Sequence, residues 1–337
     1  MSKFNIVIVV IFSLVASNVF AENSEEVSDK LYKKYLKEWS KTDFTKSSID
    51  YSRIIEGGPK KDGIPSIDNP VFKTVDGIDN IHIYEPVITV YLNGEARAYP
   101  LRILLWHEII NDKIGDTPIA VTYCPLCNSS IVFERLIDGE EVEFGTTGKL
   151  YKSNRLMYDR KTESWWQQYT GDAVVGDMIG RGLNKVISKV ESLHMYRLRQ
   201  PKGKVMVPDE IIRSYGASPY PDYDSATIPY LYDGEYKGEI APMEYVVVVG
   251  DEAWPLKTVR RMKQIEHNDI VLFWRPLQSS VLDNFNISLS RDIGNVSVIK
   301  KVEEGLFKDT NYVVTFAFVF DAFHPEGVMH HSFNSKP

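Results

Sequence analysis

Short runs of apolar and β-branched residues, separated by turn residues, recur along most of this chain and predict a protein built mainly from strands. The clearest predicted strands are residues 81–92 (interrupted at Pro86), 119–123, 131–136 and 141–144, with further strand-like segments up to residue 176. Asp138-Gly139 is a two-residue hairpin signal between the last two of these strands.

Helical spacing is rarer and is confined to short segments. Residues 28–42 place four apolar side chains on one face of a helix, and residues 101–110 predict a short helix entered through Pro100. Glycine and proline are dense at 57–65, and the 201–238 segment is also rich in turn residues. We therefore expect two ordered loops there.

The first 21 residues have the pattern of a cleaved export signal. Lys3 precedes an apolar run from Ile6 to Ala16, and small residues precede the predicted cleavage after Ala21. This run is too short for a membrane helix. We expect a periplasmic or secreted protein with no membrane span in the mature chain, a retained N-terminal anchor being the alternative.

Composition narrows the function classes. Hydrophobic residues make up 43% and charged residues 25% of the chain, which is typical of a globular protein. The formal net charge is −7 and no Lys/Arg block is present, so nucleic acid is not an expected partner. The sequence has no phosphate-loop pattern, and no nucleotide cofactor is expected.

An internal repeat is the most informative pattern. Four segments return in the same order about 150 residues later, which predicts a duplicated, domain-sized unit. The pairs are 95–102 with 252–257, 111–112 with 268–269, 119–121 with 270–272, and 123–129 with 274–280.

The resulting prediction is an α+β, mainly β fold with two related halves. The expected division is a signal peptide (1–21), an N-terminal helix and loop (22–80), a first repeat (81–200), a loop-rich connection (201–240) and a second repeat (241–337). The turn at 123–129 keeps its proline and leucine in the second half, but Arg275 and Gln278 replace its two cysteines. The second half is therefore expected to lack the reactive site.

Cys124 and Cys127 are the only two cysteines in the chain. A disulfide across so short a loop would constrain the unfolded chain very little, so a scaffolding role explains the pair poorly. His107 also lacks a histidine counterpart, because Met262 or Gln264 aligns with it in the second half. We predict that His107, Cys124 and Cys127 form one site; neutral drift in the second half is the alternative explanation.

Five motifs carry a family resemblance: GGPKKDGIPSIDNP, AYPLRILLWHEIIND, VTYCPLCNSS, FGTTGKLYKSNRLMYDRKTESWWQQYTGDAVVG and FHPEG, in that order. With them the chain resembles the domain of unknown function 3179 family over nearly its whole mature length. The resemblance implies an exported protein with a histidine and two cysteines, here His107, Cys124 and Cys127, and it supplies no reaction. Asn128 stands where a common family form has glycine, and both accept a left-handed turn.

Three functions fit these residues, and whether the protein is an enzyme stays open. The first is a soft-metal site, with copper favoured over zinc, made by Cys124, Cys127 and His107 with Glu108, Met157 or water as a further ligand. A structural zinc site usually has four protein ligands, and no second close cysteine or histidine pair lies near the turn. A metal-exchanging or redox protein would be the partner.

The second function is thiol–disulfide exchange. Pro125 predicts a helical first turn after Cys124, whose free N–H groups would lower the pKa of that thiol. Thioredoxin-like enzymes pair their motif with a downstream cis-proline, and residues 127–200 contain no proline. The scaffold is therefore not expected to be thioredoxin.

The third function is non-catalytic binding of a partner or glycan, with an inert disulfide. Trp165, Trp166 and Tyr169 would supply the binding face, although adjacent tryptophans in a strand point to opposite faces. The remaining histidines carry no predicted chemistry: His82 and His324 are expected to be structural, and Met329-His330-His331 to lie in a loose C-terminus.

Overall fold

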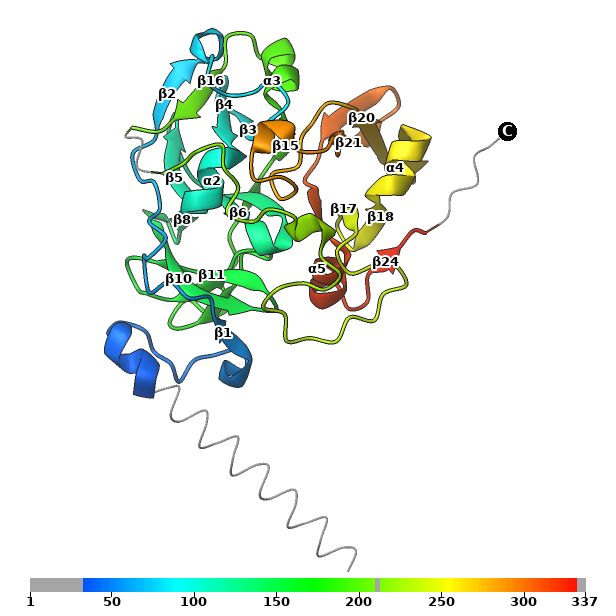
Figure 1. Cartoon of the computed structure of the whole chain (residues 1–337). Coiled ribbons are helices and arrows are strands. Elements are labelled where there is room, and N and C mark those ends of the chain that lie inside the picture. Colours follow the sequence, from blue (N-terminus) through cyan, green and yellow to red (C-terminus); the bar gives the residue numbers. More distant parts are fainter. Residues whose placement is uncertain (1–32, 210–212, 332–337) are drawn as a thin grey trace, which may run out of the picture.

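The computed structural model describes residues 33–209 and 213–331 of the chain. The mainly β prediction is confirmed, because five sheets are arranged as a five-bladed β-propeller-like ring (Figure 1). The predicted signal peptide, residues 1–21, and the first part of the predicted helix at 28–42 lie outside the described residues. Within the described ranges, no helix is long and apolar enough to cross a membrane.

Three of the five sheets come from the first two thirds of the chain. One contains, in spatial order, β1 (Ile54–Glu56), β10 (Phe144–Tyr151), β11 (Asn154–Asp159), β12 (Trp165–Gln167) and β13 (Ala173–Val175). Another contains β14 (Lys185–Val186), β7 (Ser129–Glu134), β6 (Thr117–Cys124) and β5 (Ile109–Ile114). The third contains β15 (Ser188–Ser192), β3 (Pro86–Leu92), β4 (Glu95–Pro100), β16 (Lys204–Val207) and β2 (Val71–Thr74).

The other two sheets belong to the C-terminal third. One contains β23 (Val313–Phe316), β17 (Tyr245–Val249), β18 (Glu252–Pro255) and β24 (Val328–Met329). The other contains β19 (Gln264–His267), β20 (Ile270–Arg275), β21 (Asn295–Glu303) and β22 (Leu306–Asp309). A separate hairpin consists of β8 (Leu136–Ile137) and β9 (Glu140–Glu141), as the Asp138-Gly139 signal predicts.

Helices are short and connect the strands. The α-helices are α2 (Leu101–His107), α3 (Leu193–Arg199), α4 (Leu256–Met262) and α5 (Ala317–Phe323), and residues 33–38 are also helical. The 3₁₀ turns in the described part of the chain are η1 (Tyr51–Arg53), η2 (Val75–Gly77), η3 (Pro125–Cys127), η4 (Tyr223–Ser225) and η5 (Ile287–Leu289).

The predicted elements appear at shifted boundaries for identifiable reasons. The strand predicted at 81–92 begins at Pro86, because a turn precedes that proline. The helix predicted at 101–110 ends at His107, because Glu108 adopts a left-handed conformation with φ 61°. In the loop-rich stretch at 201–238, the described residues (201–209 and 213–238) form β16 and η4 and otherwise turns and irregular segments.

The N-terminal helix is held by an aromatic cluster. Tyr35 and Trp39, both fully buried, contact the ring of Trp165 edge-on at 5.2 and 5.1 Å between ring centroids. Trp166 instead belongs to the main hydrophobic core, so the adjacent tryptophans do point to different sides of β12. Both are core residues rather than a binding face.

The order of elements recurs in the two parts of the chain. The series β3–β4–α2–β5–β6 is followed later by β17–β18–α4–β19–β20, with the same antiparallel hairpins. Each series also has a strand–helix–strand unit, β15–α3–β16 or β23–α5–β24, whose last strand runs parallel to β4 or β18. The first series differs by the strands β8 to β13, inserted between β7 and β14.

One pair of segments in the predicted repeat does not occupy equivalent places in the fold. Asn111-Asp112 lies within strand β5, whereas Asn268-Asp269 forms the turn between β19 and β20. Each helix ends at a residue with positive φ, Glu108 in the first series and Lys263 in the second. Counting four residues onward from these ends makes Asp112 and His267 the equivalent positions. Likewise Met262, rather than Gln264, ends its helix as His107 does.

Candidate functional site

The cysteine turn lies at the end of a strand, where the chain must change direction. Strand β6 ends at Cys124, and Pro125 begins η3, as its position in the sequence predicts. Asn128 closes the turn in a left-handed conformation with φ 47°, and its side chain accepts a hydrogen bond from Tyr123 Oη at 2.9 Å.

Distant segments hold this turn in place. The carbonyl of Leu126 accepts a hydrogen bond from Tyr223 Oη at 2.8 Å, and that of Cys127 accepts one from Thr315 Oγ1 at 2.6 Å. Asn128 Nδ2 donates to the carbonyl of Val314 at 3.1 Å. The loop before β17 and the strand β23 therefore fix the turn from two sides.

The two thiols are free, buried and chemically unequal. Burial alone would raise the pKa of the Cys124 thiol, but hydrogen bonds from the Cys127 thiol and from three backbone N–H groups outweigh it and lower that pKa. Two of these N–H groups belong to Leu126 and Cys127 in η3, and the third to Arg155. Burial and the neighbouring Cys124 sulfur raise the pKa of Cys127 well above its ordinary value.

A cavity of about 360 Å³ opens beside Cys124 but is not lined by Cys127. Its walls come from the cysteine turn, the glycine- and proline-rich loop, strands β10 and β11, and the loop before β17. The lining residues are Gly57, Pro59, Ile64, Glu108, Cys124, Pro125, Leu126, Gly148, Lys149, Leu150, Arg155, Tyr220, Tyr230 and Leu231. The Cys124 thiol thus borders a space large enough for a small molecule. Cys127 is fully buried and does not line that space.

A buried ion pair shares this cavity. The Glu108 carboxylate, with no exposed surface, contacts the guanidinium of Arg155, whose side chain is 8% exposed. Within the described residues, no donor other than Arg155 contacts either Glu108 oxygen, and Arg155 Nε has no acceptor. Burial lowers the pKa of Arg155 to about 10, so its guanidinium stays charged at neutral pH. Buried polar atoms with unused hydrogen-bonding capacity are suited to a polar ligand.

Both ring nitrogens of His107 have hydrogen-bond partners outside this arrangement. Its Nδ1 lies 2.8 Å from the carbonyl oxygen of Pro65, and its Nε2 lies 2.8 Å from Tyr215 Oη. Burial lowers the pKa of the imidazole, which favours its neutral form. His107 and the two cysteines do not form a cluster of ligand atoms within 4.8 Å of one another. The structure brings the two thiols and Glu108 to one region and engages both His107 nitrogens elsewhere.

The other candidates take structural positions. Met157 is fully buried in the main core. His324 lies between Asp251, 2.9 Å from its Nδ1, and Tyr169 Oη, 3.3 Å from its Nε2. His82 Nδ1 accepts a hydrogen bond from the backbone of Tyr84 at 3.4 Å.

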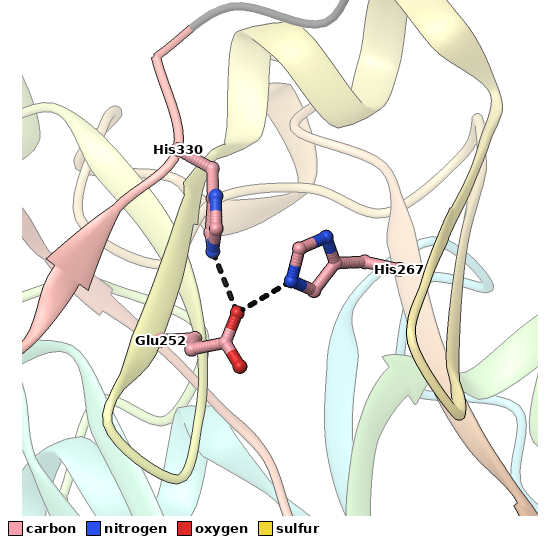
Figure 2. Close-up of side chains that lie close together, drawn as sticks. All are labelled: Glu252, His267 and His330. Carbon is pink, nitrogen blue, oxygen red and sulfur yellow. Dashed lines mark hydrogen bonds and ion pairs between the residues drawn. The ribbon is translucent and has the colours of Figure 1, made fainter.

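Sequence reasoning missed a second cluster, in the half expected to lack reactive groups. Glu252, His267 and His330 are a possible metal group, and their side chains converge in Figure 2. His330 was expected in a loose C-terminus, but its backbone N–H donates to the carbonyl of Ala253 at 2.8 Å. The three residues lie 15 and 63 positions apart in the sequence, so no local motif marks the cluster.

The comparison with protein families decides the affiliation. Residues 61–327 match the family described as "Protein of unknown function (DUF3179)". The chain belongs to this family. No curated protein and no solved structure matches it. The DUF3179 match includes the cysteine turn, Glu252 and His267, and it ends before His330.

Proposed function

We propose that Cys124 and Cys127 form a dithiol–disulfide redox centre that acts on a small disulfide in the adjoining cavity. The observation that carries the proposal is the inequality of the thiols: Cys124 has a lowered pKa and lines the cavity, whereas Cys127 has a raised pKa and lies behind it. A low-pKa attacking thiol and a buried second thiol are the two parts that thiol–disulfide exchange requires.

The reaction follows from these positions. The Cys124 thiolate attacks one sulfur of the substrate disulfide, and the other sulfur leaves as a thiolate that takes the proton of Cys127. The Cys127 thiolate then attacks Cys124 Sγ, which forms the Cys124–Cys127 disulfide and releases the second substrate half as a thiolate that takes a proton from water. The substrate gains two electrons and the protein loses two. A dithiol reductant must reduce the protein disulfide to complete a cycle.

The buried ion pair gives this cavity a preference for polar substrates. Arg155 Nε has no acceptor among the described residues, so it is free to bind a carboxylate of the substrate. Glu108 is similarly free to accept a hydrogen bond from a substrate ammonium or amide group. A small disulfide with both groups, such as one made of amino-acid or short-peptide thiols, fits this chemistry and the volume of about 360 Å³.

Trapping the mixed disulfide tests the proposal. The Cys127→Ser variant, incubated with cystine or oxidised glutathione, is expected to gain the mass of one substrate half on Cys124. The Cys124→Ser variant should gain none, because the remaining thiol is behind the cavity and has a raised pKa. Equal labelling of the two variants, or no labelling of either under denaturant-free conditions, contradicts the mechanism.

Copper binding by the cysteine pair is the competing interpretation, with the two thiolates as donors and Glu108 in the same region. His107 would have to exchange at least one of its two hydrogen bonds for the metal. The same preparations distinguish the two functions: about one equivalent of tightly bound copper, lost in Cys124→Ser/Cys127→Ser, together with no mixed disulfide, favours copper. An inert disulfide in a binding protein would give neither result.

Two further inferences accompany the proposal. The signal pattern at residues 1–21 supports export to a compartment where disulfide chemistry takes place. The recurring element order, together with the sequence echoes, supports descent of residues 86–207 and 245–329 from one duplicated unit. N-terminal sequencing of the exported protein tests the first of these.

A further inference from the structure

Three side chains from separate segments meet at the rim of the β17–β18 sheet. Glu252 begins β18, His267 ends β19, and His330 directly follows β24. Glu252 Oε2 lies 2.9 Å from His267 Nε2 and 2.6 Å from His330 Nε2. Figure 2 shows both imidazole rings directing these nitrogens at the same carboxylate oxygen.

We infer that Glu252, His267 and His330 bind one divalent transition-metal ion of the zinc type. Two imidazole nitrogens and one carboxylate are a common protein ligand set for zinc, which leaves a fourth position for water or another ligand. The site involves no residue of the cysteine cavity, so it does not depend on the redox function proposed above.

The distances are close to those that a bound ion requires. Zinc binds imidazole nitrogen and carboxylate oxygen at about 2.0–2.2 Å, so two ligands of a tetrahedral ion are about 3.3 Å apart. The three ligand atoms all lie within 4.8 Å of one another, and the two nitrogen–oxygen distances are 2.6 and 2.9 Å. Widening each contact by about half an ångström, through side-chain rotation, makes room for the ion.

The charges also favour a cation. Among the described residues, only His267 and His330 form ion pairs with Glu252, and each of them carries a charge only when protonated. The comparable place in the first series has its own permanent cation, because Arg97 pairs with Asp112 at 2.7 Å. A dication bound at Glu252 would supply the positive charge that Arg97 supplies at the comparable place in the first series.

The surroundings hold the rings in place. Trp254 stacks on His330 at 4.8 Å between ring centroids and 17° between ring planes. The side chains of Glu252, His267 and His330 are 30%, 27% and 19% exposed, so the cluster is reachable from solvent. Ligands that are fixed in advance lose less conformational freedom when the ion binds.

A bound ion would tie the end of the chain to the fold. Strand β24 has only two residues and pairs with β18 through Glu252↔Val328 and Ala253↔Met329. Through His330 the ion would link this short strand to both β18 and β19. The predicted role of the metal is therefore a clamp on the C-terminal segment, which is a readout separate from any activity.

Zinc binding to the full chain without an affinity tag tests the site. Metal-free protein, titrated with Zn²⁺ against a chromophoric chelator, is expected to bind one equivalent. The same value is expected for Cys124→Ser/Cys127→Ser. His267→Gln, His330→Gln and Glu252→Gln should each lower the affinity at least tenfold, and they should abolish the protection by Zn²⁺ of the C-terminal segment against carboxypeptidase.

His324→Gln is the matched control, because His324 also pairs with a carboxylate, Asp251, at 2.9 Å, but within the described part of the chain it belongs to no group of three converging ligand side chains. Its zinc affinity should equal that of the wild type. Circular dichroism of each metal-free variant verifies folding. Unchanged affinity in His267→Gln and His330→Gln overturns the proposal. Loss of zinc in the cysteine double variant overturns it as well, since the ion would then sit on the thiols.

Discussion

The buried pair of Glu108 and Arg155 offers the sharpest test of how the cavity is stabilised. Arg155→Met removes the cation and leaves a carboxylate with no exposed surface and no hydrogen-bond donor among the described residues. Glu108→Met leaves a guanidinium, 8% exposed, without its anion. In each single variant the remaining charge stays in a medium that solvates it poorly.

The expected magnitude follows from this burial. Removing one partner of a buried ion pair costs about 3–5 kcal/mol of the free energy of unfolding, because the desolvated charge is uncompensated. A chain of 337 residues has an unfolding entropy of about 0.7 kcal/mol/K, so about 1 kcal/mol corresponds to about 1.4 °C in Tm. Each single variant should therefore melt roughly 4–7 °C lower. The double variant buries neither charge, and we expect it to be more stable than either single variant.

Urea unfolding followed by tryptophan fluorescence measures these differences, with the m-value verifying that the transition is unchanged in kind. Arg181→Met is the matched control, because Arg181 and Asp138 form an exposed pair, 57% and 59% accessible, worth at most about 1 kcal/mol. If each single variant loses less than about 1 kcal/mol and the double variant loses the sum, the pair is not the buried, mutually dependent unit described above.

Three further outcomes are expected. Gly148→Ala should be more destabilising than Gly139→Ala, as measured by Tm: both glycines have positive φ (73° and 83°), but only at Gly148 does a Cβ meet neighbouring backbone. The alkylation rate of Cys124 by iodoacetamide should reach half its maximum below the pH of about 8.5 typical of a free cysteine, and Cys127→Ala should move that midpoint upward by removing a hydrogen bond to the thiolate. Thr315→Val should lower the free energy of unfolding by about 1–3 kcal/mol, because the buried carbonyl of Cys127 loses its donor; an unchanged urea midpoint would argue against that contact.

Local sequence signals predicted the local structure well. Pro125 at the start of the turn, Asn128 in a left-handed conformation and the Asp138-Gly139 hairpin all follow from backbone preferences of single residues. The ring of five sheets did not follow, because strand order depends on contacts between segments far apart in the chain. The pairing of β1 with β10 joins residues 54–56 to residues 149–151, and no local pattern encodes it.

The site was predicted in part. The cysteine pair and the influence of the first helical turn on Cys124 were visible in the sequence, whereas the direction of the His107 side chain was not. That direction depends on Pro65 and Tyr215, which approach from two distant loops. Arg155 was missed for the same reason, since nothing in its neighbourhood in the sequence marks it as the partner of Glu108.

Strands β8 to β13 have no counterpart in the second series, so adding two cysteines to that series would not reproduce the cavity. Strands β10 and β11 supply Lys149 and Arg155 to the cavity, and no corresponding strands follow β20. Thiols engineered at Arg275 and Gln278 would occupy a turn without the walls that β10 and β11 supply beside Cys124. The cavity beside Cys124 thus depends on strands β10 and β11 as much as on the cysteine turn itself.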